Sequence, residues 1–577
     1  MNDSLPSLPV LEGAQVLLRP ITMEDTPRIV AWRNDPEVLQ NFIYRGPFTE
    51  EIHTNWIRTR VASGEVVQYV IVDRDSGRDV GSVYFRDIDS LERSAEYGIF
   101  IGEASGRGRG LGSETARLFT DFGFEKLGLE RITLRLLSDN LRAQRSYEKA
   151  GFRLDERRRE TVRLDGRTRE LVFMVKRRED FEAEQKPKLV IIGASDFQNP
   201  LILQAKAMGY QTHVFAWECG DVGEKTADVF YPFSIVEKEK ILELCRPLRP
   251  AGVCSIGSDL AAITVNFVAE ELGLVGNGMV SAMTATNKHL MRLAFERDGL
   301  PSCRSVLVEE DTDLSALDLR PPLIAKPTDR SGSRGIRKIA SLSELPEAIA
   351  FAREPSFEKK VLVEEFAEGR EYSVEYVSWQ GQHFFLAVTE KFTTGAPLFV
   401  ETGHLQPPLH MDAQTLAQIR ALVPRVLDCL GVRCGASHTE LKVDKDGSIR
   451  LIECGARMGG DCIGSDLVPL STGVNFVRAV IDVACGRAPA LQPEQPPRVA
   501  AVRFLFGPED LDALRRIEAE APQNLLRVSP IDPFDGHEVR DSSTRYGYYI
   551  LAADSQEEMT RLLRMSALPE SFLEDSP

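Results

Sequence analysis

The chain has 577 residues, 43% of them hydrophobic, which is enough for three or four domains with cores of their own. Its formal net charge of −17 argues against a broad nucleic-acid or anionic-membrane surface, because phosphate polymers require a basic footprint. No apolar run marks an export signal or a membrane span, and the nine cysteines, all after residue 218, include no CxxC pair. These features predict a globular cytoplasmic protein with small-molecule partners, no nucleic acid and no membrane; they leave a homodimer open.

Residues 10–178 form the first predicted domain. Strands are expected at 16–19, 68–72, 80–85 and 95–101. A helix is expected over 22–34, with Thr22 as its N-cap and Asp25 closing a near capping box. A glycine-rich loop, GRGRGLG, then opens an amphipathic helix whose inner face carries Ala116, Phe119 and Phe122 or Gly123. Converging backbone N–H groups and the positive end of the helix dipole predict an anion site at this junction.

The pattern Arg107-x-x-Gly110-x-Gly112 after a strand, followed about thirty residues later by SDNLRAQRSYEKAGF, resembles the GNAT acetyltransferase family. The opening LRPITMEDTPRIVAWRNDPEV is similar to the branch that acetylates protein N-termini or amino-sugars. The resemblance implies acetyl-CoA as cofactor, its pantetheine region met by Asn140. It implies a pyrophosphate cradle of Arg107, Gly108, Arg109, Gly110, Leu111 and Gly112.

The same resemblance implies two catalytic residues in this domain. Tyr147 would be the general acid that protonates the departing thiolate; the alternative is an aromatic packed beside Phe152. Glu96 would be the base that deprotonates the incoming ammonium through a water, and the alternative is an exposed strand residue.

A charged segment, KRREDFEAEQKP at 176–187, is nearly free of aliphatic residues and predicts a connector, with the linker proper at 179–187. After it, an apolar strand at 188–192, a helix at 201–208 and a strand at 212–216 predict βαβ units of a parallel sheet. The single glycine of the first turn is too sparse for a dinucleotide fingerprint, so NAD is not expected.

A predicted hairpin at 435–461 carries two glutamates that face each other. If Asp446-Gly447 forms a two-residue type I′ turn, Glu440 lies directly opposite Glu453, and a four-residue loop leaves them one diagonal step apart. Like charges so placed destabilise a hairpin unless a cation lies between them, and oxygen ligands that leave room for phosphate suit Mg²⁺, with Mn²⁺ as an alternative. The other interpretation is a solvated acidic strand edge. The Arg457-Met-Gly-Gly that follows favours a phosphate pocket.

This hairpin resembles that of the ATP-grasp ligases, which carries an acidic residue and then Glu-x-Asn-x-Arg. Gly455 stands where the family has Asn, so one ligand of a second Mg²⁺ is missing, for which Asp461 or water would substitute. The resemblance implies a Rossmann-like domain at 188–285 and an ATP-grasp domain at 286–490. Residues 496–566 are expected to form a small α+β lobe, and the tail at 567–577 is expected to be disordered.

Further residues follow the family's order along the chain. Phosphate neutralisation is implied for Lys288 and Lys326, and a phosphate-covering loop for Ser331, Gly332 and Ser333. Backbone contacts to the adenine edge are implied for Glu364, Glu365, Phe366 and Ala367, and a ribose contact for Glu371. LFVETGHLQPP, SGSRGI and ECGARMGGD are similar to the branch that joins L-amino acids into dipeptides, which implies an acyl-phosphate and substrate site with Glu401, His404 and Arg457. His404 is alternatively a loop histidine with satisfied hydrogen bonds.

The sequence therefore predicts a multidomain α/β and α+β enzyme with two activities, an acetyl-CoA-dependent N-acetyltransferase and an ATP- and Mg²⁺-dependent carboxylate–amine ligase working through an acyl phosphate. Its substrates are expected to be amino acids or peptide-like small molecules. The alternative is that the ATP-grasp half is a nucleotide-binding sensor, with Gly455 as its lesion, that regulates an acetyltransferase acting on protein N-termini or amino-sugars.

Overall fold

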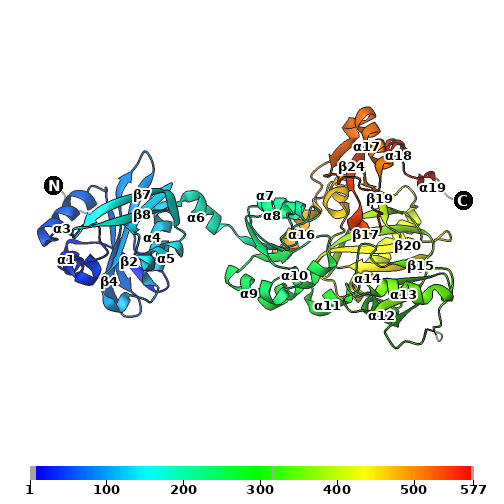
Figure 1. Cartoon of the computed structure of the whole chain (residues 1–577), viewed down its shortest axis with the longest axis horizontal. Coiled ribbons are helices and arrows are strands. Elements are labelled where there is room, and N and C mark those ends of the chain that lie inside the picture. The colour runs from blue at the N-terminus through cyan, green and yellow to red at the C-terminus, as the bar shows by residue number, and fades with distance from the viewer. Residues whose placement is uncertain (1–7, 315–316, 574–577) are drawn as a thin grey trace. The chain divides into compact units, whose positions relative to one another are not determined.

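The computed structural model describes residues 8–314 and 317–573 of the chain. The chain divides into two compact units, Met1–Lys186 and Pro187–Pro577 (Figure 1). Each unit has its own hydrophobic cores, so the two are described separately.

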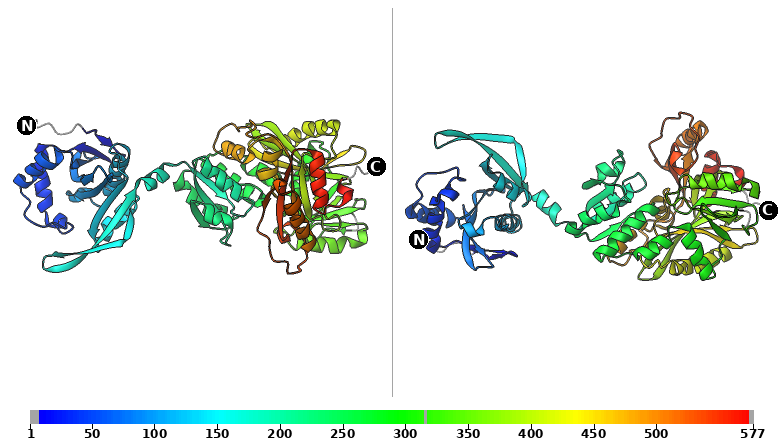
Figure 2. Two further views of the ribbon diagram at one scale, coloured as in Figure 1. Left: turned by 90° about the horizontal axis from the view of Figure 1, so that it is seen from above. Right: turned by 60° about the horizontal axis from the view of Figure 1, so that its bottom comes forward.

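The first unit is built on an eight-stranded sheet in the order β1-β2-β3-β4-β5-β6-β8-β7. The strands are β1 (Leu11–Glu12), β2 (Val16–Pro20), β3 (Val67–Asp73), β4 (Arg78–Asp89), β5 (Ser94–Ile101), β6 (Arg131–Leu137), β7 (Arg153–Leu164) and β8 (Arg167–Arg177). Only β5 and β6 run parallel, and they pair over 94–96 and 131–133 alone although both continue beyond. The two strands therefore part towards their C-terminal ends, where ligands commonly bind in parallel sheets. The long hairpin β7–β8 extends beyond the rest of this unit (Figure 2).

Six α-helices belong to the described part of this unit, and two of them, α1 and α4, lie where the sequence predicts a helix. The six are α1 (Thr26–Asn34), α2 (Pro36–Leu39), α3 (Glu50–Trp56), α4 (Leu111–Glu125), α5 (Leu141–Glu148) and α6 (Arg178–Gln185). The predicted capping box of Thr22 and Asp25 is present, although it opens a 3-10 turn that precedes α1. The predicted inner face of α4 is confirmed, because Ala116, Phe119, Phe122 and Gly123 are all buried.

The predicted linker at 179–187 is wrong for most of its length, because residues 178–185 form helix α6. Phe181 is buried and stacks on Phe124, with ring centroids 5.3 Å apart. Buried Lys176 of β8 lies 3.1 Å from Glu184. One phenylalanine in a charged segment is enough to dock an amphipathic helix. The connector outside regular structure is therefore only Lys186 and Pro187.

The second unit begins with a parallel sheet in the order β11-β10-β9-β12, which confirms the predicted βαβ units. Its strands are β9 (Lys188–Ile192), β10 (Gln211–Ala216), β11 (Val229–Pro232) and β12 (Gly252–Cys254). The helices of this part are α7 (Asn199–Ala207), α8 (Val222–Thr226), α9 (Lys238–Leu248), α10 (Asp259–Leu272) and α11 (Gly278–Thr284).

Two further sheets follow. A four-stranded antiparallel sheet, β13-β16-β14-β15, packs against α13 (Leu345–Arg353), with α12 (Lys288–Arg297) nearby (Figure 1). Its strands are β13 (Ser305–Val308), β14 (Leu323–Pro327), β15 (Arg337–Ile339) and β16 (Val361–Glu365).

The larger sheet has eight strands in the order β21-β20-β17-β18-β19-β22-β24-β23. They are β17 (Arg370–Trp379), β18 (Gln382–Thr393), β19 (Glu401–Gln406), β20 (Gly435–Val443), β21 (Ile449–Gly455), β22 (Val499–Leu505), β23 (Leu525–Val528) and β24 (Gly547–Ala553). The predicted C-terminal lobe thus has no sheet of its own among the described residues, since β19 pairs directly with β22. The associated helices are α14 (Ala413–Cys429), α15 (Val468–Thr472), α16 (Phe476–Ala484), α17 (Pro508–Glu520) and α18 (Gln556–Met565).

The predicted disordered tail is wrong for residues 567–573, which end in helix α19 (Glu570–Leu573). Leu568 and Leu573 are buried, and the Phe572 ring lies 5.2 Å from that of Phe392. Apolar side chains at this spacing hold a short helix onto the core despite its acidic surroundings. Residues 574–577 lie outside the described residues.

No single helix among the described residues is long and apolar enough to cross a bilayer. A pair bent by 117°, Ile463–Thr472 and Phe476–Ala484, reaches that length and composition together. Most side chains of the second helix are buried in the core of the second unit.

Candidate functional site

The β20–β21 hairpin places Glu440 directly opposite Glu453, as predicted, but by a different route. The predicted two-residue turn is wrong. Asp444 N donates to Ser448 O at 3.0 Å, and Gly447 is the one residue of this fully described loop with positive φ. This longer loop shifts the register by one residue, and a bulge between Glu440 and Leu441 shifts it back.

Each of these two glutamates is paired with a lysine. Lys288 Nζ lies 2.6 Å from Glu453 Oε2, and Lys391 Nζ lies 2.5 Å from Glu440 Oε1. Lys391 also lies 3.2 Å from Glu371. Burial would lower the pKa of both lysines, but the neighbouring carboxylates outweigh it and raise both pKa values. Both side chains therefore carry their charge, next to two carboxylates, at the place predicted for phosphate and metal.

Sequence reasoning missed Lys391. It lies on β18 within the run FFLAVTEKFTT and belongs to none of the recognised motifs. Residues 386–392 of this strand are all buried, so Lys391 lies where an unpaired charge is costly. It points into a cluster with Glu371, Glu401 and Glu440.

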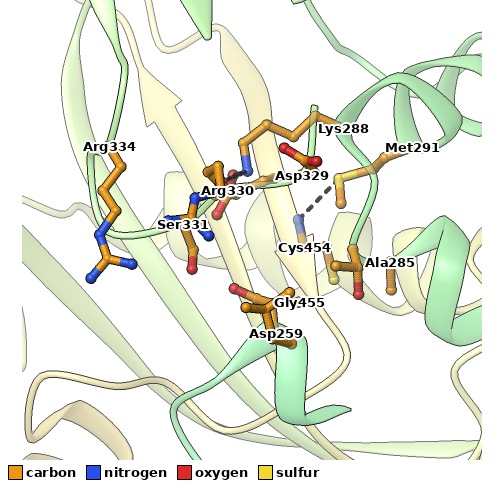
Figure 3. Close-up of a pocket in the computed structure, with 13 residues that line it drawn as sticks. Asp259, Ala285, Lys288, Met291, Asp329, Arg330, Ser331, Arg334, Cys454 and Gly455 are labelled. Carbon is orange, nitrogen blue, oxygen red and sulfur yellow. Dashed lines mark hydrogen bonds and ion pairs between the residues drawn. The ribbon is translucent and has the colours of Figure 1, made fainter. Parts of the chain in front are cut away.

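A small cavity of about 30 Å³ lies beside Lys288 and Glu453 (Figure 3). The predicted Gly/Ser loop forms one wall, through Arg330, Ser331 and Arg334, and Lys288 Nζ donates to the Arg330 carbonyl at 3.0 Å. In this loop Gly332 and Ser333 have φ of +70° and +59°, a conformation that turns successive N–H groups to one side. The loop therefore lies where the resemblance places phosphate.

A larger groove of about 990 Å³ is lined by two of the residues predicted to meet the nucleoside. Phe366, Glu371 and Lys391 line it, together with Lys442. Lys338 lies over the Phe366 ring at 3.6 Å. Of the predicted nucleotide residues, Lys288 and Ser331 line the small cavity, and Phe366 and Glu371 line the groove. Lys391, which also lines the groove, contacts Glu440 of the hairpin.

Two parts of the predicted nucleotide site, Lys326 and the adenine hinge, already bind other groups of the protein. Lys326 Nζ lies 2.7 Å from Glu364 Oε2, and the same carboxylate accepts from Arg292 Nε at 2.6 Å. Burial lowers the pKa of Lys326. In the predicted adenine hinge, the backbone N–H groups of Glu365 and Phe366 already donate to the carbonyls of Arg304 and Pro322. A base would therefore have to use Ala367 or the hinge carbonyls.

The three residues predicted for the substrate site fall into separate places. Glu401 Oε1 lies 3.7 Å from Lys391 Nζ, so Glu401 belongs to the lysine cluster. His404 is buried, which lowers its pKa, and its Nε2 lies 3.9 Å from Asp461 Oδ2. Arg457 forms a bidentate pair with Asp259, with N–O distances of 2.8 and 3.0 Å.

The residues predicted to hold Mg²⁺ offer two carboxylates, Glu440 and Glu453. Glu440 and Glu453 have side chains 16% and 18% exposed, so neither side chain is fully buried. Among residues 8–314 and 317–573, no group of three or more His, Cys, Asp or Glu is arranged to hold an ion. Asp461 accepts from Arg545 at 2.8 Å, so it does not replace the missing Asn in this arrangement. Two carboxylates fit Mg²⁺ that takes its other ligands from phosphates and water.

In the first unit, the predicted pyrophosphate loop joins β5 to α4. Gly108 and Gly110 have φ of +80° and +90°, and Gly110 is the N-cap of α4. A Cβ added at Gly108 would meet no atom within 4 Å, so this backbone face is open to a ligand. The side chains of Arg107 and Arg109 contact Glu37 and Asp73, at 2.5 and 2.7 Å.

The remaining residues predicted for this unit have structural partners. Asn140 caps α5 by accepting from Ala143 N at 3.2 Å. Burial raises the pKa of the Tyr147 phenol, whose ring packs edge-on against Tyr97 at 5.9 Å. Glu96 is paired with Arg86 and Arg135. The catalytic roles of Tyr147 and Glu96 stay predictions.

Comparisons with known proteins agree with this geometry. Residues 15–153 match the acetyltransferase (GNAT) domain model and residues 319–466 the ATP-grasp domain model. An alanine–anticapsin ligase of Bacillus subtilis is 29% identical over 308 residues, which are 46% of this chain and 63% of that protein, so the chain spans less than two thirds of this relative. A D-alanine–D-alanine ligase of Ralstonia nicotianae is 25% identical over 236 residues, 38% of this chain and 70% of that protein.

The solved structure of an L-amino acid ligase from Bacillus licheniformis has the same fold as the second unit. It gives a TM-score of 0.56 at 23% identity and covers 66% of this chain and 97% of that one. The two predicted resemblances and the predicted multidomain fold are confirmed. The chain joins a GNAT acetyltransferase domain at residues 15–153 to an ATP-grasp domain at residues 319–466.

Proposed function

We propose that the protein is a bifunctional enzyme, an acetyl-CoA-dependent N-acetyltransferase and an ATP-dependent carboxylate–amine ligase for amino acids or peptide-like small molecules. The observation that carries the ligase assignment is the arrangement of Glu440 and Glu453 across one hairpin, each with its own buried lysine, beside a Gly/Ser loop. A solvated acidic edge would not bury two charged lysines against it.

The reaction class follows from the chemistry of a carboxylate, which is a poor electrophile because its leaving group would be oxide. Transfer of the ATP γ-phosphoryl group to a carboxylate oxygen releases ADP and makes an acyl phosphate. An amine nitrogen then attacks the acyl carbon, the C–O bond to phosphate breaks, and the ammonium proton is lost to solvent. Similar relatives include ligases named for alanine–anticapsin and for L-amino acids.

The chain's own residues would hold and neutralise the phosphates. Lys288 and Lys391 are charged and lie next to the site, and loop 330–334 supplies backbone N–H groups. Glu440 and Glu453 would hold Mg²⁺, which supplies charge neutralisation at the transferring phosphoryl group. Mn²⁺ is the alternative ion for the same two oxygens.

The acetyltransferase assignment is supported by the open glycine loop at the start of α4 and by the separation of β5 from β6 beside it. Backbone N–H groups of residues 108–112 would bind the pyrophosphate of acetyl-CoA. Tyr147, which is protonated at all physiological pH values because burial raises its pKa, would donate to the departing thiolate.

Release of ADP and phosphate from ATP in mixtures of the twenty amino acids tests the ligase, and release of CoA from acetyl-CoA with amine mixtures tests the transferase. We expect ADP release that depends on added amino acids. A protein that binds ATP but releases no ADP with any mixture contradicts the ligase.

Gly455 favours one other function, a nucleotide-binding sensor that regulates the acetyltransferase, because the amide oxygen of the family's Asn is absent. The same assay separates the two. Acetyl transfer that changes with ATP while no ADP forms would support the sensor, and acetylated protein N-termini in a mass spectrum would point to protein rather than small-molecule substrates.

A further inference from the structure

Arg457 is held in one orientation by a residue of the Rossmann-like part. Asp259 is the first residue of α10, and its two carboxylate oxygens accept from Arg457 Nε and Nη2 at 2.8 and 3.0 Å. The side chains are 15% and 11% exposed. Burial alone would raise the pKa of Asp259, but Arg457 and Lys288 outweigh it and lower the pKa. The pair is therefore charged on both sides.

The pair explains why a glycine occupies position 455. A Cβ on Gly455 would lie 2.9 Å from Asp259 Oδ1 and 3.2 Å from Arg457 Cζ. Both contacts are closer than ordinary van der Waals distance, and both partners are fixed by the ion pair itself. Figure 3 shows Asp259 directly beside Gly455 at one side of the cavity. The space that a side chain at 455 would fill is taken by the Asp259 carboxylate.

The guanidinium of Arg457 has more N–H donors than Asp259 uses. Guanidinium has five N–H donors. One on Nε and one on Nη2 bind Asp259, and Nη1 makes a long contact of 3.5 Å with the Met458 carbonyl. The guanidinium lies next to two residues that line the cavity, Gly455 and Asp259. An anion in the site would meet an arginine whose direction is already fixed, which costs less entropy than orienting a free side chain.

We propose that Asp259 is a positioning residue that orients Arg457 towards the transferring phosphoryl group, and that Gly455 is required because it makes room for Asp259. This inference rests on the proposed ligase function. On this proposal, Gly455 in place of the family's Asn reflects a rearranged site that keeps its activity. The Rossmann-like part then contributes a residue, Asp259, to the part of the site that binds phosphate.

The functional test compares D259N, R457K and the double variant in ATP turnover with an amino-acid mixture. Asn keeps the size of Asp259 but offers one acceptor, and Lys cannot form a bidentate pair. We expect kcat to fall about tenfold or more in each single variant, with KM for ATP changed less than about threefold. The double variant should be no slower than R457K alone, because Asp259 acts through Arg457. D259N at the wild-type kcat, or losses that multiply in the double variant, would overturn the proposal.

D482N is the matched control, because Asp482 pairs with Arg487 at 2.7 Å and is also buried, in helix α16. It should lower the Tm without changing kcat. An equal fall of kcat in D482N would show that any lost ion pair slows the enzyme, which contradicts a positioning role.

A second double-mutant comparison measures thermal unfolding and does not require the protein to turn over ATP. G455A should lower the Tm in the wild-type background and much less in a D259A background, where the colliding carboxylate is gone. Equal losses in both backgrounds would overturn the link between Gly455 and Asp259. If the wild-type protein shows no turnover, the proposed function is wrong, and this thermal cycle alone decides whether Asp259 and Gly455 form one unit.

Discussion

At the scale of single residues, the ligase site is a set of compensated charges. Lys288 pairs with Glu453, Lys391 with Glu440 and Arg457 with Asp259. Each pair is largely buried, so removing one partner leaves an uncompensated charge, which is costly in a low-dielectric site. Nucleotide phosphates and their cation would take over the charges of the first two pairs, while Asp259 would stay bound to Arg457 and hold its orientation.

We predict that E453Q abolishes amino-acid-dependent ADP release and spares acetyl transfer. The variant removes a carboxylate predicted to hold the metal and leaves Lys288 without its partner. Each unit has its own hydrophobic core, so the effect should remain in the second unit. The two activities are measured on the same preparation. E509Q, at an exposed position in the first turn of α17, is the control. Turnover in E453Q would refute the metal assignment.

We predict that G110V weakens acetyl-CoA binding at least about tenfold. Gly110 has φ of +90°, which a β-branched residue resists, and the added side chain would stand in the open face of the loop. G64V is a matched control, because Gly64 has φ of +82° with open space around it, outside the predicted loop. Calorimetric titration compares the two. Equal affinity in both variants would mean that the loop does not bind the cofactor.

Some of this residue-level detail was accessible from sequence and some was not. The opposition of Glu440 and Glu453 was predicted correctly from the hairpin pattern, yet through a wrong turn, because a bulge compensated for the longer loop. Bulges leave no reliable mark in a single sequence. Lys391 and Asp259 were missed because each acts through partners distant along the chain: 49 residues separate Lys391 from Glu440, and 198 separate Asp259 from Arg457.

At the scale of elements, the prediction was wrong at the C-terminal end of each unit, because charged residues surround the last helix there. Helices α6 and α19 each bury aromatic or aliphatic side chains that the surrounding charges concealed, Phe181 in one and Leu573 in the other. Helix α4 and the first two strands of the parallel sheet, β9 and β10, were predicted correctly, because α4 spaces its apolar residues at the helical period and β9 is a continuous apolar run.

The anchoring of α6 creates a pH-dependent element. Lys176 Nζ lies 3.1 Å from Glu184 of α6 and 3.8 Å from Asp121 of α4. Burial raises the pKa of Asp121 to about 6, although Lys176 opposes the shift. A carboxyl whose pKa is raised on folding stabilises the folded state at low pH, and this contribution is lost as the pH rises through 6.

We therefore predict that D121N raises the Tm of the first unit at pH near 7.5, because Asn cannot ionise, by on the order of 2 °C after allowing for solvent screening. The gain should shrink as the pH is lowered to about 5, where the wild-type carboxyl is largely protonated. Calorimetric scans of the whole chain at both pH values measure it. E156Q, at an exposed position of β7 whose charge does not act on Asp121, should show no such trend. A gain that is equal at both pH values would contradict the pKa argument.

At the scale of the whole molecule, the chain carries two sites on separately folded units joined by Lys186 and Pro187. Tethering two sites raises the effective concentration of a shared intermediate, on the order of millimolar for short connectors. This has a catalytic consequence only if both sites act on one compound. The chemistry of the two reactions then fixes their order.

The last prediction is that acetylation precedes ligation. Acetylating an amine removes its charge and its nucleophilicity, so the product can enter the ligase only as the carboxylate donor, and it cannot polymerise with itself. The acetylated acid would be phosphorylated and a free amino compound would be the acceptor. We test this hypothesis by supplying candidate acids with and without a pre-installed acetyl group and following ADP release. Faster turnover of the acetylated acid is expected. Faster turnover of the free amino acid would reverse the order, and the absence of any compound used by both sites would refute a shared substrate.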